Sequence, residues 1–194
     1  MKAPPPSLHQ DLQALHEALG ARMRSEWQRD VPFTELLFDR WDRAETLRFG
    51  EGTSIYHNSY VYGNVEVGRH TWIGPFTLLD GTGGLTIGDY CSISAGVQLY
   101  SHDTVAWAVS GGKAPYAYRP VHIGHCCFIG PGSVVRAGVT VGDHSVIGAH
   151  SFVNRDVPGQ SIVAGSPARL IGRVHLSEDD VTFEYFQTPV EASR

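Results

Sequence analysis

One short segment of the chain, Ser101-His102-Asp103, combines residue types that can move protons. An imidazole titrates near neutral pH, so a histidine can accept a proton from a hydroxyl group and release it again. The chain has ten histidines, and a solvated surface position explains most of them. His102 differs because it directly precedes the one long interruption of an otherwise regular pattern, and Asp103 breaks that pattern. Such local departures are typical of functional sites.

The regular pattern is a six-residue repeat of Val, Ile or Leu that begins at residue 61. It slips by two residues after Leu79 and is interrupted by a longer excursion after Leu99. The residue after the aliphatic one is glycine in seven repeats, and the fourth residue after it is small or β-branched in twelve. Thirteen aliphatic positions in register are far beyond chance. They are Val61, Val67, Ile73, Leu79, Ile87, Ile93, Leu99, Ile123, Ile129, Val135, Val141, Ile147 and Val153.

Six residues are enough for one short strand and one tight turn, and three such units close a triangular coil. The aliphatic side chain then points inward and the small residue fills a corner, while glycine allows either a positive φ or a close approach. Successive coils stack at the strand spacing of about 4.8 Å. We therefore predict an all-β fold, a parallel β-helix of somewhat more than four coils over residues 55–174. The repeat alone does not fix its hand.

Three segments lie outside the repeat. Residues 1–50 are predicted to be an N-terminal helical segment, with an amphipathic helix over residues 7–27 and a shorter helix over residues 33–48. Residues 103–121 are predicted to be a loop extruded from one corner, because they contain turn residues and their inward positions are unsuitable. Residues 175–194 are expected to form a C-terminal tail.

Large apolar residues also occur directly before the inward aliphatic positions, where a side chain points outward. They recur at the spacing of one coil, which predicts two apolar stacks on neighbouring faces. A solvated face would not carry such stacks, so they indicate an interface, and we expect a homotrimer around a three-fold axis. The two stacks are Trp72, Phe128 and Val146, and Leu78, Val134 and Phe152.

Composition narrows the class of protein. The 194 residues include 22 Gly and 11 Pro, which are too many turn-forming residues for a helical bundle. Hydrophobic residues make up 42% of the chain, which is too high a share for a disordered protein. The net charge of −5 argues against nucleic acid or an anionic membrane as a partner. No apolar run suggests a membrane span or a signal peptide. Three cysteines without a CxxC motif are expected to be reduced thiols in a cytoplasmic protein.

Several further segments are specific enough to compare with known families. They are Ser101-His102-Asp103, Pro120-Val121-His122-Ile123-Gly124, Gly138-Val139-Thr140-Val141-Gly142, Val146-Ile147-Gly148-Ala149, Asp156-Val157-Pro158 and Val163-Ala164-Gly165-Ser166-Pro167-Ala168-Arg169. With these segments, residues 55–174 resemble the hexapeptide-repeat acyltransferases, in particular the sugar and nodulation-type O-acetyltransferases. The resemblance implies a left-handed β-helix, a homotrimer, an acyl-coenzyme A donor and a site in the groove between two subunits.

The resemblance also implies roles for individual residues. The loop histidine, His102, is expected to be the catalytic base that takes the proton of an acceptor hydroxyl as it attacks the thioester, by direct transfer without a covalent enzyme intermediate. Two carboxylates are candidates by position and not by the resemblance: Asp103, next to His102, and Asp80, one coil before it, could bind the acceptor or orient His102. The expected acyl-CoA-binding residues are Phe128, Gly130, Pro131, Ala149, Asn154, Arg155, Arg169 and Arg173. Acetyl-CoA, or another acyl-CoA, is a co-substrate, so no permanently bound cofactor and no metal are expected.

Other functions stay open at this stage. The acceptor is expected to be a saccharide or another small molecule, and the acylated group is a hydroxyl or, on an amino sugar, an amine. A non-catalytic trimeric scaffold is a second alternative. A metal enzyme of the carbonic anhydrase type on the same fold is the third, but the histidine spacing disfavours it: that family pairs two histidines five residues apart, and no pair here has this spacing.

Overall fold

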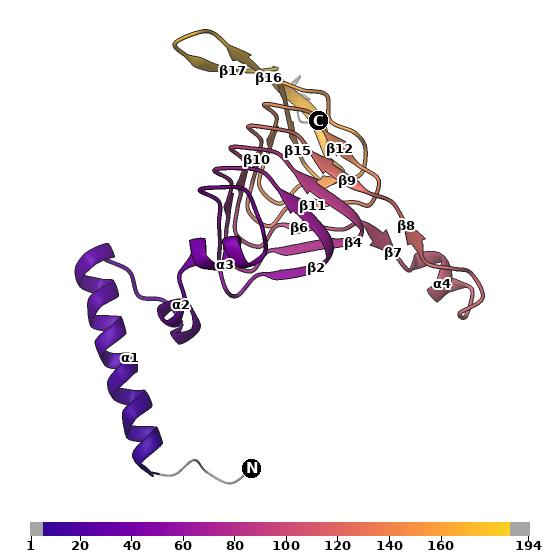
Figure 1. The fold of residues 1–194 in the computed structure, drawn as a ribbon. Coiled ribbons are helices and arrows are strands. Elements are labelled where there is room, and N and C mark those ends of the chain that lie inside the picture. The colour runs from indigo at the N-terminus through magenta and orange to yellow at the C-terminus, as the bar shows by residue number, and fades with distance from the viewer. Residues whose placement is uncertain (1–5, 187–194) are drawn as a thin grey trace, which may run out of the picture.

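The computed structural model describes residues 6–186, and most of them form a parallel β-helix with three faces (Figure 1). The predicted all-β fold with a helical appendage and one extruded loop is confirmed. The chain runs from the first face to the second and then to the third in each coil. Strands on each face pair in parallel with those of the coils before and after them.

The first face is the most regular of the three. It stacks β1 (Ser54–Ile55), β3 (Trp72–Ile73), β5 (Ser92–Ile93), β10 (Phe128–Ile129), β13 (Val146–Ile147) and β15 (Ser161–Ala164). The second face contains the first halves of β2 (Tyr60–Val67) and β4 (Leu78–Ile87), followed by β6 (Gln98–Leu99), β11 (Val134–Val135) and β14 (Phe152–Val153). The third contains the second halves of β2 and β4 with β9 (Val121–Ile123) and β12 (Thr140–Val141). Six strands are stacked on the first face, so the solenoid is longer than the prediction of somewhat more than four coils.

The core consists of the repeated aliphatic side chains. All thirteen except Val61, which is partly exposed, are buried along the axis of the solenoid. Burial of each such side chain contributes about 1.5–3 kcal/mol to folding. The predicted outward apolar stacks are confirmed in part, since Phe128 pairs with Val146 on the first face and Val134 pairs with Phe152 on the second. Trp72 and Leu78 lie on these same faces, but Ser92 separates Trp72 from Phe128 and Gln98 separates Leu78 from Val134.

The repeat glycines are required by close approach and not by a positive φ. A Cβ on Gly88 would lie 2.7 Å from the carbonyl oxygen of Gly124, and a Cβ on Gly130 would lie 2.6 Å from the amide nitrogen of Ala149. The positive φ falls two residues later, for example at Tyr90 with φ 56°. The backbones of successive coils therefore pack too closely at these corners for any side chain.

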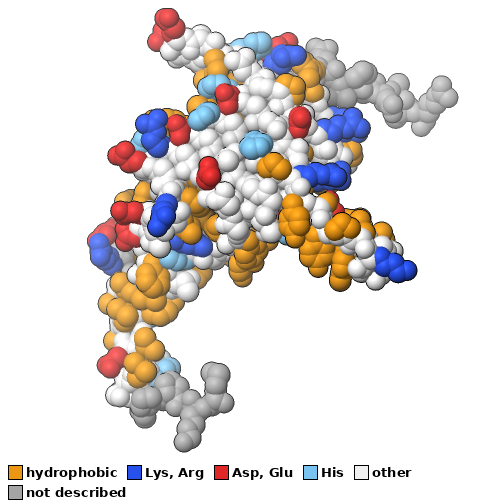
Figure 2. All heavy atoms as spheres, turned by 45° about the vertical axis from the view of Figure 1, so that its right-hand side comes forward, with side chains coloured by type: hydrophobic (Ala, Val, Ile, Leu, Met, Phe, Trp, Pro, Cys, Tyr) orange, Lys and Arg blue, Asp and Glu red, His pale blue; other side chains and the backbone are white. Residues whose placement is uncertain are grey.

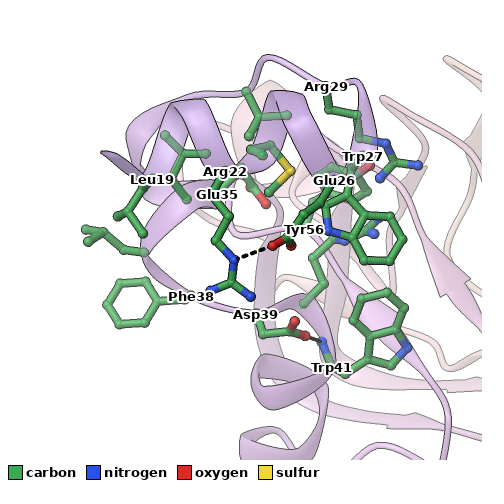
Figure 3. A pocket seen from close by; sticks show the side chains of 15 residues that line it. Leu19, Arg22, Glu26, Trp27, Arg29, Glu35, Phe38, Asp39, Trp41 and Tyr56 are labelled. Atoms are coloured by element: carbon green, nitrogen blue, oxygen red, sulfur yellow. Dashed lines mark hydrogen bonds and ion pairs between the residues drawn. The ribbon is translucent and has the colours of Figure 1, made fainter. Parts of the chain in front are cut away.

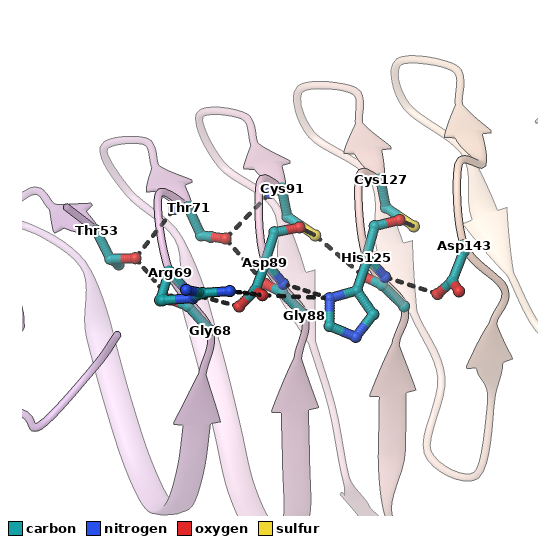
Figure 4. A network of polar contacts seen from close by, with 11 residues as sticks. Thr53, Gly68, Arg69, Thr71, Gly88, Asp89, Cys91, His125, Cys127 and Asp143 are labelled. Atoms are coloured by element: carbon teal, nitrogen blue, oxygen red, sulfur yellow. Dashed lines mark hydrogen bonds and ion pairs between the residues drawn. The ribbon is translucent and has the colours of Figure 1, made fainter. Parts of the chain in front are cut away.

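The small inward residues form hydrogen-bonded ladders along the corners (Figure 4). The Thr71 hydroxyl donates to the Gly88 carbonyl at 2.9 Å and accepts the Cys91 amide at 3.0 Å. The Cys91 thiol in turn donates to the Gly124 carbonyl at 3.1 Å. Both Cys91 and Cys127 are buried free thiols in this ladder, so their chemistry is structural here.

The N-terminal helices differ in part from the prediction. The helix expected over residues 7–27 is α1 (Pro6–Trp27), which stands away from the solenoid (Figure 1). The single helix expected over residues 33–48 is wrong, because two helices, α2 (Phe33–Leu37) and α3 (Arg40–Thr46), replace it. The Asp39 side chain accepts the Trp41 amide at 2.7 Å and so starts a new helix after the extended residue Phe38.

Two further elements leave the solenoid. The extruded loop contains β7 (His102–Asp103), α4 (Val105–Val109) and β8 (Ala117–Tyr118), with β7 and β8 paired antiparallel. We call residues 103–120 the arm. Beyond the last coil, β16 (Arg169–Leu176) and β17 (Val181–Tyr185) form an antiparallel hairpin. The sequence predicts only a tail over residues 175–194 and no hairpin there. The end of that tail, residues 187–194, lies outside the described residues.

Hydrophobic side chains gather on the arm and on the N-terminal helices (Figure 2). Leu8, Leu12 and Leu15 of α1 and Val105, Trp107 and Val109 of the arm are exposed in the single chain. No helix in the described part of the chain is long and apolar enough to cross a membrane. The predicted cytoplasmic location stays a prediction.

Candidate active site

The two-residue slip in the repeat creates the corner at which the candidate site lies. It falls in the middle of β4, where the strand turns from the second face to the third, and the pairing with β2 shifts register there. The arm leaves the solenoid at the same corner, one coil later. Asp80 occupies the start of the slip and is buried, with 1% of its surface exposed.

Asp80 and His102 form the central contact of this corner. The Oδ2 atom of Asp80 and the Nδ1 atom of His102 are 2.5 Å apart, and 31% of the His102 side chain is exposed. Asp80 Oδ2 also accepts the backbone amides of Ser101 at 3.0 Å and of His102 at 3.2 Å. The carboxylate therefore holds both the ring of His102 and the backbone that carries it.

The other oxygen of Asp80 is bound to Thr82. Asp80 Oδ1 accepts the Thr82 amide at 2.9 Å and the Thr82 hydroxyl at 2.5 Å. Burial by itself would raise the pKa of the Asp80 carboxyl, but the hydrogen bonds from Thr82, His102 and Ser101 outweigh it and hold that pKa below its ordinary value. Asp80 is thus ionised at neutral pH and acts only as an acceptor. The His102 Nδ1 then carries the proton of this bond, and Nε2 is left as the basic nitrogen.

The root of the arm is held by the backbone around Ser101. Ser101 is fully buried, its hydroxyl accepts the Gly83 amide at 2.7 Å, and its carbonyl accepts the Arg119 amide at 2.8 Å. A Cβ on Gly83 would lie 2.2 Å from the Ser101 carbonyl oxygen, so only glycine fits there. The two ends of the arm are therefore fixed next to each other.

Sequence reasoning missed Tyr118, which lies opposite His102 in the β7–β8 pair. The two rings are stacked, with centroids 6.1 Å apart and planes inclined by 26°. No signal in the six-residue repeat reaches into the arm, so the register of this pair could not be predicted.

Asp103, the second candidate carboxylate, turns toward the arm. Its side chain accepts the Val105 amide at 3.2 Å, at the start of α4. Of the two candidates for orienting His102, Asp80 is the one that contacts the imidazole. A role of Asp103 in binding the acceptor stays a prediction.

The candidate donor-binding residues fall into two groups. Gly130 and Pro131 follow β10, and Ala149 follows β13 in the next coil, so they stack at the corner between the first and second faces. The Pro131 carbonyl accepts the His150 amide at 2.9 Å, which links these two turns. Phe128, 42% exposed, precedes them on the first face. This corner differs from that of His102, because the second face lies between them.

The second group lies nearer the C-terminal end of the solenoid. Asn154 and Arg155 follow β14, at the corner between the second and third faces, and Asn154 Oδ1 is buried without a hydrogen-bond partner among the described residues. Arg169 and Arg173 are exposed on β16, beside Ala164 and Ser161 of the last coil. The second group is therefore divided: Asn154 and Arg155 share the corner of His102, two coils further along, whereas Arg169 and Arg173 lie on a strand that extends the first face. Gly130, Pro131 and Ala149 lie at a different corner from His102 within one chain.

Other recesses lie away from this corner. A cavity of about 250 Å³ between α1 and the segment from α2 to α3 is lined by Glu35, Trp27, Trp41 and other residues of the appendage (Figure 3). A shallow recess on the third face contains Asp89 and His125. Within residues 6–186, no three His, Cys, Asp or Glu side chains converge as ligands for a metal ion.

The chain is similar to several known proteins. Residues 120–155 match the family described as bacterial transferase hexapeptide (six repeats). Galactoside O-acetyltransferase of Escherichia coli K12 is 30% identical over an alignment of 143 residues. The alignment covers 69% of this chain and 66%, just under two thirds, of that enzyme. WcaF of Escherichia coli K12, named as a colanic acid biosynthesis acetyltransferase, is 31% identical over 68% of this chain and 74% of its own length.

A solved structure of galactoside acetyltransferase in complex with coenzyme A superimposes with a TM-score of 0.64. The sequence identity is 26%, over 84% of this chain and 82% of that chain. Most of the solenoid and part of its appendages therefore have a counterpart in that structure.

Proposed function

The chain belongs to the hexapeptide-repeat acetyltransferase family, and we propose that it transfers an acetyl group from acetyl-CoA to a hydroxyl group of a saccharide. The observation that carries this proposal is the contact between Asp80 and His102 at the root of the arm. It supplies a histidine that is held in place, partly exposed and unprotonated at Nε2, which is what general-base catalysis of acyl transfer requires.

The proposed reaction is a direct transfer. The Nε2 atom of His102 takes the proton of the acceptor hydroxyl while its oxygen attacks the thioester carbonyl. The tetrahedral intermediate then collapses, the carbon–sulfur bond breaks, and the departing thiolate takes the proton back from the imidazolium. Asp80 stabilises the imidazolium electrostatically and keeps Nδ1 turned away from the acceptor.

We propose that acetyl-CoA lies between two protomers of a trimer. In one chain, His102 and the turns of Gly130 and Ala149 belong to different corners, so a donor bound at those turns reaches the histidine of a neighbour more readily than its own. The outward apolar stacks on the first and second faces are surfaces that such a trimer would bury. Arg169 and Arg173 carry the charge and fork geometry suited to the phosphates of the donor.

The acceptor class rests on the relatives. One relative is named for galactosides and another for the biosynthesis of a polysaccharide, colanic acid. An amino sugar acylated on nitrogen would use the same base, so product analysis has to separate the two outcomes.

A carbonic anhydrase site would require histidines from neighbouring chains, and a scaffold would require no donor at all.

The proposal is tested by measuring thiol release from acetyl-CoA by the purified protein with a panel of neutral sugars and amino sugars. Thiol release that depends on a sugar, with an acetyl ester in the product, supports it. An amide product instead assigns N-acetylation. If millimolar acetyl-CoA neither raises the melting temperature nor releases thiol with any sugar, the scaffold alternative replaces this proposal.

A further inference from the structure

We propose that Tyr118 forms an aromatic wall of the acceptor site, against which the ring of a saccharide stacks while one of its hydroxyl groups meets His102. This inference rests on the proposed function. It makes Tyr118 a residue that determines acceptor specificity, and it assigns a task to the strand on which the arm returns.

The first observation is the position of Tyr118 relative to the imidazole. Tyr118 on β8 lies directly opposite His102 on β7, and the two rings are stacked with centroids 6.1 Å apart. Asp80 contacts Nδ1 from the buried side of the same ring. The edge of the imidazole that contains Nε2 is then left for the acceptor, and Tyr118 is the aromatic ring stacked beside that imidazole.

The second observation is the exposure of the Tyr118 ring. In the single chain 54% of its surface is exposed, although its neighbour Ser101 at the root of the arm is fully buried. An exposed aromatic ring beside a held base offers a flat apolar surface that water solvates poorly. Its phenolic hydroxyl adds a polar group at the rim of that surface.

A saccharide ring matches this arrangement chemically. Its axial C–H groups form an apolar face, and its hydroxyl groups point outward from the rim. If that face rests on Tyr118, a rim hydroxyl is directed toward Nε2 of His102. Ligand sites commonly combine such an aromatic wall with a few polar groups that fix orientation.

The arm also contains a second pair of exposed aromatic rings. Trp107 of α4 and Tyr116 contact each other edge to face, with centroids 5.5 Å apart, and both are exposed. Hydrophobic side chains are gathered on this arm in the space-filling view (Figure 2). The arm is thus better suited to an acceptor with several apolar ring faces than to a small acyclic alcohol.

The test compares Tyr118→Ala and Tyr118→Phe in steady-state assays of thiol release with the best saccharide. Tyr118→Ala should raise the KM for the saccharide about three- to ten-fold, the range that one aromatic stacking contact supplies. The KM for acetyl-CoA and the melting temperature should not change. Tyr118→Phe should restore the saccharide KM to within about two-fold, because the ring and not the hydroxyl makes the contact.

Tyr90→Ala provides a matched control. Tyr90 is stacked on His70 with centroids 4.9 Å apart and planes inclined by 27°, and 59% of its surface is exposed. It lies at the corner between the third and first faces, away from Asp80 and His102. Removal of this second stacked tyrosine should leave the saccharide KM unchanged.

The outcomes separate this inference from the proposed function. If native protein is active but Tyr118→Ala keeps the native saccharide KM, the inference fails and the proposed function stands. The inference also fails if Tyr118→Ala changes both KM values together or lowers the melting temperature, because Tyr118 then only supports the arm. If native protein releases no thiol with any saccharide, both are overturned.

Discussion

Asp80 and His102 are 22 residues apart in the sequence, yet Asp80 Oδ2 and His102 Nδ1 are 2.5 Å apart. The contact exists because a two-residue slip in one coil and the exit of the arm in the next coil fall at the same corner. One irregularity supplies a buried carboxylate and the other supplies the histidine. The two breaks in the repeat thus jointly build the proposed catalytic pair.

The first prediction concerns the role of Asp80 as a positioning residue. Asp80→Asn should lower kcat at least about 100-fold, because an amide cannot fix the Nδ1–H tautomer and cannot stabilise the imidazolium. The KM for acetyl-CoA should change little. Asp89→Asn is the matched control, since Asp89 lies 3.8 Å from His125 at another corner, and its activity should remain native. Equal losses in both variants would remove Asp80 from the mechanism.

A second prediction follows from the lowered pKa of Asp80. Because this pKa lies below that of the unfolded chain, the ionised carboxylate stabilises the native state above the ordinary carboxyl pKa of about 3.9. That stability is lost as the pH falls through the lower, native value. The difference in unfolding free energy between native protein and Asp80→Asn should therefore be constant from about pH 7 to 5 and shrink below about pH 4. Urea unfolding at several pH values measures it, and a difference that does not depend on pH would contradict the assignment.

A third prediction tests the close packing of the coils. Gly88→Ala should lower the melting temperature clearly, because its Cβ would lie 2.7 Å from the Gly124 carbonyl oxygen and the backbone cannot yield there. Gly20→Ala in α1 is the control, since the nearest atom to its Cβ is at the flexible end of Arg24. Alanine favours a helix by about 1 kcal/mol over glycine, so this variant should be as stable as native protein or more so. Thermal unfolding followed by circular dichroism distinguishes the two results.

A fourth prediction concerns the proposed trimer. Val134→Glu places a charge in the apolar stack on the second face, where Val134 pairs with Phe152, and it should convert trimers to monomers. Thr140→Glu on the third face, where the outward residue is already polar and exposed, should leave the mass unchanged. Light scattering coupled to size-exclusion chromatography measures the mass. A mass of one chain for the native protein would contradict the proposed trimer.

The six-residue repeat predicts the solenoid well because each coil gives its residues the same environment. The inward aliphatic positions, the stacked outward positions and the exit of the arm after His102 all follow from the period alone. From the period alone, the repeat glycines could serve either a positive φ or a close approach of two backbones. Only the stacked backbones in the structure show that close approach is the reason. Close approach depends on the next coil and not on local sequence.

The remaining differences arise where the repeat does not apply. The helix predicted over residues 33–48 divides because the Asp39 carboxylate caps a new helix. The spacing of apolar residues, from which the single helix was predicted, contains no information about such a cap. Asp80 was one of two candidates, and three-dimensional stacking of adjacent coils was needed to bring it to His102. Tyr118 was missed because its partner depends on the register of a two-residue strand pair across the arm.

The most direct test of the proposed mechanism is the turnover of His102→Ala with acetyl-CoA and a saccharide acceptor, next to His125→Ala as a second histidine that lies near a carboxylate. The mechanism predicts that His102→Ala lowers kcat at least about 100-fold while its mass and melting temperature match those of native protein. His125→Ala should keep native turnover. Near-native turnover by folded His102→Ala would contradict the assignment of His102 as the base.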